Sequence, residues 1–333
     1  MPVVGACEPG LTRVRLDVAY DGAGFSGWAR QPGQRTVQET LEETMARVLR
    51  LPAPAPLTVA GRTDAGVHAA GQVAHCDLPA LVWESAAGAA RRKLARALPP
   101  DIRVRRIAAA PPGFDARFSA LWRRYAYRVC DDPAGADPLS RGTTLWYQRG
   151  LDLDAMNEAA RACLGEHDFA AFCRRREGAS TVRALLRFEW ARTGPGLVVA
   201  TVVADAFCHN MVRALIGACL RAGDASRPPA WPGQVLAART RDPAVPVMPP
   251  HGLCLAEVGY PPDHELAARA AVTRRVRPAP PGGPVSGGGP ASASGLPGGR
   301  GRVNVPPGSG GSGFAGDHPA GQAHVGGAGD EPG

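Results

Sequence analysis

The chain has 333 residues, enough for one large domain or two modest ones that each bury a core, and its formal net charge is +8. A positive charge favours an acidic partner such as nucleic acid, but the near absence of lysine is typical of a GC-rich genome and weakens that inference. Neither a signal segment nor a run of about 20 apolar residues is visible, so we expect a cytoplasmic protein without membrane contact.

Strand and helix signals organise the first part of the chain. Residues 13–20 alternate apolar and polar side chains, which is the period of a half-buried strand. Thr36, with Glu39 three positions later, forms a capping-box signal for a helix that the proline-rich residues 52–56 end. Further along we expect a short strand, a glycine-punctuated loop, a second short strand and a helix, at 57–60, 61–71, 72–76 and 84–98.

The second part of the chain repeats this alternation of strands and helices. A long strand rich in aromatic residues is predicted over 117–130, and Asp152 or Asp154 begins a helix that runs to Leu164. Two strands joined by a glycine-proline turn, a helix and a final strand then follow, at 182–192, 197–205, 209–222 and 253–258. Strands interleaved with helices through hairpin-like links predict an α+β fold with a mainly antiparallel sheet flanked by helices.

This repetition also predicts the domain organisation. We expect two similar lobes, an N-terminal one over 11–112 and a C-terminal one over 113–262, with an active-site cleft between them. From Pro278 onward, runs such as PPGGPVSGGGP leave almost nothing large to bury. Residues 263–333 are therefore predicted to be a disordered tail rich in glycine and proline.

The cysteines give no sign of a metal site. They form no CxxC pair and no Cys/His cluster at zinc-ligand spacing. We expect reduced, mostly buried thiols at all eight positions: Cys7, Cys76, Cys130, Cys163, Cys173, Cys208, Cys219 and Cys254.

The segment AGRTDAGVHA, residues 60–69, is the most informative in the chain. It brings a carboxylate, a guanidinium, a hydroxyl and an imidazole into one loop whose glycines permit close approach to a ligand. From the residues alone, Asp64 is a nucleophile or general base, a turn residue, or a helix N-cap. His68 contacts a ligand or braces the loop.

With this segment the chain resembles the tRNA pseudouridine synthase A family, through GRTDAGVHA, whose aspartate matches Asp64. Asn210, where other members often carry a histidine, and the SALW of residues 119–122 depart from the family pattern. The resemblance covers about residues 11–260. Its further motifs occur in family order, namely YDG, FSGW and TVQ within residues 20–38, FDARFSA at 114–120, RRY at 123–125, FCHNMVR at 207–213 and GLCL at 252–255.

The resemblance implies an isomerase that converts uridine to pseudouridine at positions 38, 39 and 40 in the anticodon stem-loop of tRNA. It implies no cofactor, no metal, and a homodimer that binds tRNA across both subunits. Asp64 is the expected nucleophile, and the sequence leaves open whether it attacks C1′ of the sugar or C6 of the uracil, or assists a glycal route.

The same resemblance assigns roles to three further residues. Arg213 matches the basic residue that pairs with the catalytic aspartate and keeps it ionised and oriented. Tyr125 matches the tyrosine that stacks on the extruded base, and Leu253, or Leu255 in its place, supplies the opposite apolar wall. Arg62 directly precedes Thr63 and Asp64, and by this position it is expected to fill the space left by the flipped base, to hold its phosphate, or to make a structural hydrogen bond to the loop.

Two other interpretations stay open at this level. One is a noncatalytic RNA-binding or RNA-folding protein on the same scaffold, and the other is catalysis on a different RNA site. The arginine runs are either phosphate contacts or solvated faces, and they lie at 91–93, 103–106, 123–124 and 174–176.

Overall fold

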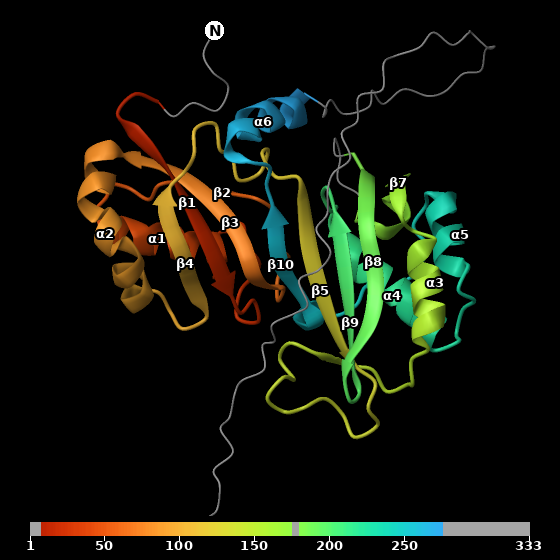
Figure 1. Cartoon of the computed structure of the whole chain (residues 1–333). Coiled ribbons are helices and arrows are strands. Elements are labelled where there is room, and N and C mark those ends of the chain that lie inside the picture. The colour runs from red at the N-terminus through yellow and green to blue at the C-terminus, as the bar shows by residue number, and fades with distance from the viewer. Residues whose placement is uncertain (1–7, 175–179, 276–333) are drawn as a thin grey trace, which may run out of the picture. The chain divides into compact units, whose positions relative to one another are not determined.

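The computed structural model describes residues 8–174 and 180–275, and these belong to one compact unit. A ten-stranded sheet runs through it (Figure 1). The strands are β1 (Leu11–Tyr20), β2 (Thr58–Val59), β3 (His68–Pro79), β4 (Ile102–Ala109), β5 (Trp122–Cys130), β6 (Leu145–Trp146), β7 (Gly165–Asp168), β8 (Val182–Gly194), β9 (Leu197–Ala204) and β10 (Leu253–Gly259). The helices are α1 (Val37–Leu49), α2 (Ala80–Ala97), α3 (Leu153–Arg161), α4 (Met211–Gly223), α5 (Trp231–Ala238) and α6 (Leu266–Arg275). Single 3₁₀ turns are η1 (Ala170–Phe172), η2 (Pro250–Gly252) and η3 (Asp263–Glu265).

The sheet is mainly antiparallel, and the α+β prediction is confirmed. Its strand order is β4-β1-β3-β10-β5-β9-β8-β7, with β2 paired to β3 and β6 paired to β5. Only the β3–β10 and β5–β6 pairs are parallel among the described strands. The late strand β10 enters between β3 and β5, so it joins the strands of the first and second parts of the chain into one sheet. The division into lobes at residue 112 stays a prediction.

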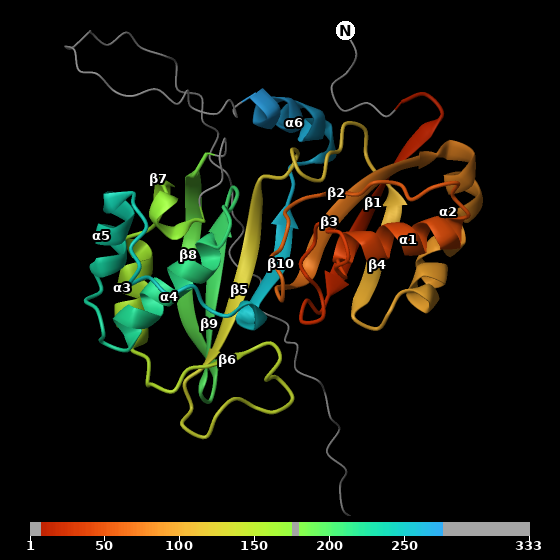
Figure 2. The ribbon, with the colours of Figure 1, turned by 180° about the vertical axis from the view of Figure 1, so that it is seen from behind.

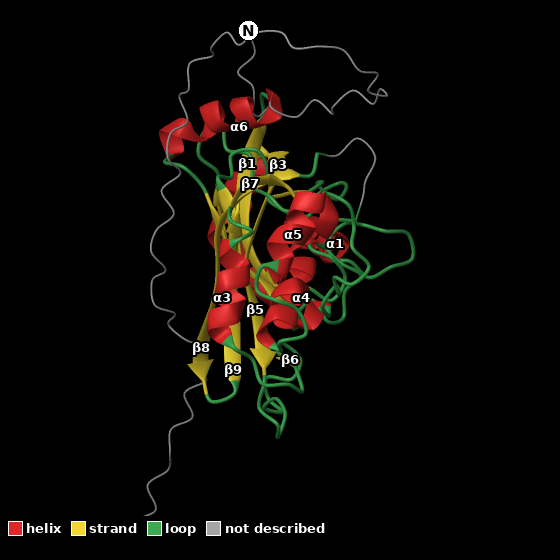
Figure 3. Cartoon of the chain, turned by 90° about the vertical axis from the view of Figure 1, so that its right-hand side faces the viewer, coloured by secondary structure: helices red, strands yellow, loops and turns green. Residues whose placement is uncertain are grey.

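Helices α1 and α4 lie on the same face of the sheet (Figures 2 and 3). Helix α1 presents Leu41 and Met45 to the core, where neither keeps any exposed surface. The alternation predicted for β1 is confirmed, since Val14 and Leu16 are fully buried between less buried neighbours. One apolar side of the sheet therefore packs against apolar helix faces, which is what the binary pattern requires.

The start of α1 follows the sequence signal. The hydroxyl of Thr36 accepts the backbone N–H of Glu39 and satisfies one of the free donors at the helix N-terminus. The carboxylate of Glu39 lies 3.6 Å from the guanidinium of Arg30. The helix ends at Arg50, which adopts the left-handed conformation that often terminates helices.

The predicted strand over 117–130 is too long at its N-terminal end, because β5 begins only at Trp122. The carboxylate of Asp115 accepts the backbone N–H groups of Arg117 and Phe118, each at 2.9 Å, and this side-chain contact fixes a turn. The alternation of buried and exposed residues from Ile102 marks β4, a strand that the sequence analysis did not predict.

The expected end of the fold at residue 262 is also wrong. Helix α6 follows, with Leu266 and Ala270 at 2% and 0% exposure. The hydroxyl of Ser119 donates to the carbonyl of Leu266, and Arg274 pairs with Asp115 at 2.6 Å. Leu266 and Ala270 form a small buried apolar face that the composition does not reveal. The rest of the predicted tail, 276–333, lies outside the described residues.

The expectation that all cysteines are reduced is corrected at one pair. Cys173, which follows η1, and Cys208, which follows β9, form a disulfide with a Cα–Cα separation of 5.8 Å. They are 35 residues apart in sequence, so no spacing motif marks the pair. Cys76, Cys130 and Cys163 are free and buried. Within the described ranges, no helix is long and apolar enough to cross a membrane.

Candidate active site

Buried side chains hold the loop between β2 and β3 that carries the conspicuous aspartate. The hydroxyl of Thr63 lies 2.7 Å from that of Tyr20, and its carbonyl accepts the backbone N–H of Trp28 at 3.1 Å. The amide of Gln72 donates to the carbonyl of Gly61 at 2.8 Å. These contacts join the loop to β1 and β3, so the backbone position of the residue after Thr63 is fixed by the sheet.

Close backbone contacts tighten the same loop. A Cβ on Gly22 would lie 2.1 Å from the carbonyl oxygen of Val67, so only glycine fits there. The ring of His68 is buried: its Nδ1 accepts the N–H of Gly22 at 3.1 Å, and its Nε2 is 3.1 Å from the carbonyl of Gly142. Nδ1 also lies 3.0 Å from Oδ1 of Asp21, and a buried ring with these contacts on both nitrogens supports the loop-bracing interpretation of His68.

The carboxylate of Asp64 meets two side chains from a distant part of the chain. Oδ1 lies 3.4 Å from Nε2 of His209, and Oδ2 lies 3.6 Å from Nη2 of Arg213. Both distances exceed the 2.7–2.9 Å typical of a charge-assisted hydrogen bond. The Asp64 side chain keeps 33% of its surface exposed, so the acid is oriented by two partners and can still reach a ligand.

Arg213 is anchored independently of the aspartate. It stands in the first turn of α4, where Nη2 donates to Oδ1 of Asn210 at 2.6 Å and Nη1 donates to the carbonyl of Met248 at 3.2 Å. The backbone N–H of Met248 in turn donates to the carbonyl of Arg213. The guanidinium is therefore placed by its own neighbours, at a position that faces the acid.

Tyr125 and the leucines of β10 form an apolar region of the sheet. Tyr125 lies opposite Leu255, whereas Leu253 lies opposite Tyr127. The Tyr125 ring is 7% exposed and packs edge-on against Phe207 with centroids 5.1 Å apart. Burial raises the pKa of the Tyr125 hydroxyl well above its usual value, so this group stays neutral at physiological pH.

Comparison with known proteins identifies the family of this chain. A family model described as tRNA pseudouridine synthase matches residues 159–261. The tRNA pseudouridine synthase A of Streptomyces griseus subsp. griseus is 61% identical over 83% of this chain and 98% of that protein. The proteins of that name from Frankia casuarinae and Mycobacterium leprae are 61% and 50% identical, over 82% and 80% of this chain and 99% and 95% of their own lengths. The chain belongs to the tRNA pseudouridine synthase A family. A solved archaeal box H/ACA sRNP Nop10-Cbf5 complex matches with 11% identity over 62% of this chain and 43% of that chain, and its TM-score of 0.26 carries no argument.

The remaining predicted residues of this family member are placed as follows. Arg62 is exposed, directly before Thr63 and Asp64. Arg123 is buried and donates to the carbonyls of Ala60 and Asp205. It therefore stabilises the fold; for its arginine run, a phosphate contact was one of the two interpretations. Its neighbour Arg124 pairs with Glu257 of the adjacent strand β10 at 2.7 Å.

His209 is the contact that sequence reasoning missed. It belongs to the quoted FCHNMVR motif but was given no role. The signal available was its position four residues before Arg213, at the start of a helix. No cluster of three or more His, Cys, Asp or Glu side chains that could hold a metal ion occurs in residues 8–174 and 180–275.

Proposed function

We propose that this chain isomerises uridine to pseudouridine at positions 38, 39 and 40 in the anticodon stem-loop of tRNA, with Asp64 as the nucleophile. One observation carries the proposal: a partly exposed carboxylate, set in a fixed loop, lies between a histidine and an arginine from a distant segment. Membership of the tRNA pseudouridine synthase A family supports uridine in tRNA as the substrate.

The reaction is balanced without an oxidant or reductant. The bond between N1 of uracil and C1′ of ribose breaks, and a bond between C5 and C1′ forms. The proton on C5 leaves, and N1 gains a proton. Attack of Asp64 on C1′ or on C6 requires the ionised carboxylate beside an extruded nucleotide, and 33% exposure of that side chain gives it access.

Four side chains complete the proposed mechanism. Arg213, 3.6 Å from the carboxylate of Asp64, orients it. Tyr125 supplies a flat ring for the extruded uracil, and Leu253, or Leu255 which lies opposite Tyr125 in the sheet, supplies an apolar wall. Arg62 is exposed beside the acid, which suits contact with the phosphate of the flipped nucleotide or occupation of the space that its base leaves.

We propose the cytoplasm as the place of action and a homodimer that binds tRNA across both subunits as the assembly. The family resemblance supports both. Light scattering on the purified protein, alone and with tRNA, tests the assembly. A monomer in both samples would contradict it.

The function is tested by mapping pseudouridine in tRNA from cells with and without this protein. We expect pseudouridine at positions 38, 39 and 40 to disappear with the protein and to return when the purified protein is added. Loss of pseudouridine at other positions instead would mean that the enzyme modifies a different RNA site. Tight tRNA binding with no conversion would favour the noncatalytic RNA-binding alternative.

A further inference from the structure

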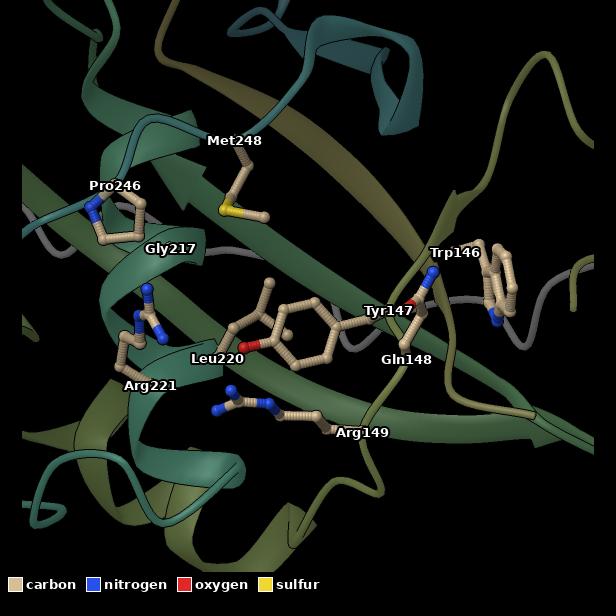
Figure 4. Close-up of a pocket in the computed structure, with 9 residues that line it drawn as sticks. All are labelled: Trp146, Tyr147, Gln148, Arg149, Gly217, Leu220, Arg221, Pro246 and Met248. Atoms are coloured by element: carbon tan, nitrogen blue, oxygen red, sulfur yellow. The ribbon is translucent and has the colours of Figure 1, made fainter. Parts of the chain in front are cut away.

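A hollow of about 340 Å³ lies beside α4, on the far side of Arg213 from Asp64 along the helix. We call it the α4 hollow. Figure 4 shows the ring of Tyr147 pointing toward Leu220, with Arg149 alongside the ring and Met248 reaching in from the opposite side. Its lining combines apolar and cationic groups, namely Tyr147, Arg149, Leu220, Arg221, Pro246 and Met248.

The cationic edge of the hollow carries an excess of positive charge. Arg149 and Arg221 share one carboxylate, that of Asp224, at 3.0 and 3.9 Å. The Asp224 side chain has no exposed surface, whereas those of Arg149 and Arg221 are 61% and 40% exposed. A guanidinium has five N–H donors, and the described contacts of both arginines use Nη1 alone. Donors therefore remain for an anion from outside.

The floor of the hollow is apolar. Leu220, Pro246 and Met248 line it together with the ring of Tyr147, whose hydroxyl is held by Asp224 at 2.6 Å. An inorganic anion has no apolar part that could contact this floor. A nucleotide offers a phosphate for the arginines and a flat base for the apolar floor, which is how unpaired nucleotides bind to proteins.

One lining residue of the hollow, Met248, also contacts the candidate active site. Met248, whose side chain lines the hollow, exchanges two hydrogen bonds with Arg213, the partner of Asp64. Arg213 and Arg221 lie on the same helix, eight residues or about 12 Å apart. At a rise of about 3.4 Å per stacked nucleotide, this span corresponds to a few nucleotides.

We propose that the α4 hollow binds one unpaired nucleotide of the RNA substrate, a few positions from the uridine that Asp64 modifies. Arg149 and Arg221 hold its phosphate, and Leu220, Met248 and Tyr147 contact its base. This inference rests on the proposed function for the identity of the RNA.

The test is a double variant, Arg149→Gln with Arg221→Gln, which removes both cations and leaves Asp224 its hydrogen bonds from Tyr147 and Ser226. A matched control, Arg187→Gln with Arg192→Gln, removes two cations of β8 that also pair with carboxylates. Thermal melts establish that both variants fold.

Binding of a tRNA transcript is then measured over a range of salt concentrations. We expect the Kd of the double variant to rise about tenfold and its log–log salt dependence to become shallower by about 0.7 to 0.9, the value for one neutralised phosphate. The control should match the wild type. A double variant that binds tRNA like the control would overturn the proposal.

Two further measurements are needed. One distinguishes a free nucleotide from a nucleotide of the RNA, and the other distinguishes the proposal for the α4 hollow from the proposed function. If AMP raises the Tm of the wild type but not of the double variant, while tRNA binding is equal in both, the hollow takes a free nucleotide and the RNA assignment is overturned. Pseudouridine formation is scored in the same samples. If the wild type forms pseudouridine and the double variant binds tRNA with an unchanged Kd, only the proposal for the α4 hollow is overturned. If the wild type forms no pseudouridine, only the proposed function is overturned.

Discussion

The loop that carries Asp64 and the segment that carries Arg213 are held in different ways. Buried hydrogen bonds from Tyr20 and Gln72 join the loop to the sheet. Arg213 is held at the start of a helix by Asn210 and a backbone carbonyl, and it approaches the acid only to 3.6 Å. The acid is therefore fixed by the fold, whereas the ion pair can adjust when a charged substrate arrives. The two regions should respond differently to substitution.

The largest effect is expected at the acid itself. Asp64→Asn keeps the size of the side chain and removes the charge that every proposed route needs, so the single-turnover rate should fall by at least about 1,000-fold. Binding of tRNA should persist, because affinity comes from many phosphate contacts. Gel-shift and melting measurements are the controls. A folded Asp64→Asn protein that converts uridine at the wild-type rate would remove Asp64 from the mechanism.

The partner on the helix should matter less. Arg213→Gln removes the cation that orients Asp64, and misplacement of a catalytic group by about 1 Å costs on the order of 100-fold in rate. Single-turnover rates at saturating tRNA measure the effect. Arg192→Gln, which removes a cation of β8 that pairs with Asp131, is a control for loss of charge. Equal rates for the two variants would contradict the role of Arg213.

Two substitutions of Tyr125 distinguish the role of its ring from that of its hydroxyl. Tyr125→Ala should lower activity by about 10- to 100-fold, because stacking of a base on an aromatic ring contributes about 1–3 kcal/mol. Tyr125→Phe keeps the ring and should retain most of the activity. Single-turnover rates for the two variants decide. Equal inactivity of both would assign the essential function to the hydroxyl.

A smaller effect is expected where the loop is anchored. Tyr20→Phe leaves the buried hydroxyl of Thr63 without its 2.7 Å partner, which should lower the free energy of unfolding by about 1–3 kcal/mol and reduce the rate several-fold. Tyr260→Phe removes a hydrogen bond of the same length, which the Tyr260 hydroxyl donates to the carbonyl of Ala116. Urea unfolding and rate measurements should show lost stability in both variants but a slower reaction only in Tyr20→Phe.

The smallest expected effect concerns stability alone. Burial, with a contribution from the nearby Arg13, lowers the pKa of His75 to about 4, and Nδ1 of this ring accepts the N–H of Ala116. The folded state therefore binds the proton less readily than the unfolded state. Stability should be intact above about pH 6.5 and fall by up to about 3 kcal/mol as the pH drops toward 4. Urea unfolding at several pH values should show a flatter dependence for His75→Gln. An unchanged slope would contradict this.

Local structure was largely predictable from the sequence. The alternation in β1, the Thr36 cap of α1 and the hairpin of β8 and β9 follow from neighbours a few residues apart. The boundary error at β5 arises from the side chain of Asp115, which fixes a local turn. The boundary error at α6 arises from contacts over long sequence separations. One is the packing of Leu266 against the segment that contains Ser119.

The sequence by itself determined the loop that carries Asp64, because its glycines and its Thr-Asp pair are local features, and it determined the family motifs that surround this loop. The tertiary structure alone decided that β10 enters between β3 and β5, that Cys173 meets Cys208, and that His209 joins Arg213 at the carboxylate of Asp64. These contacts depend on how distant strands and helices pack. Packing is selected by the burial of apolar surface over the whole unit and leaves no signal within a few residues.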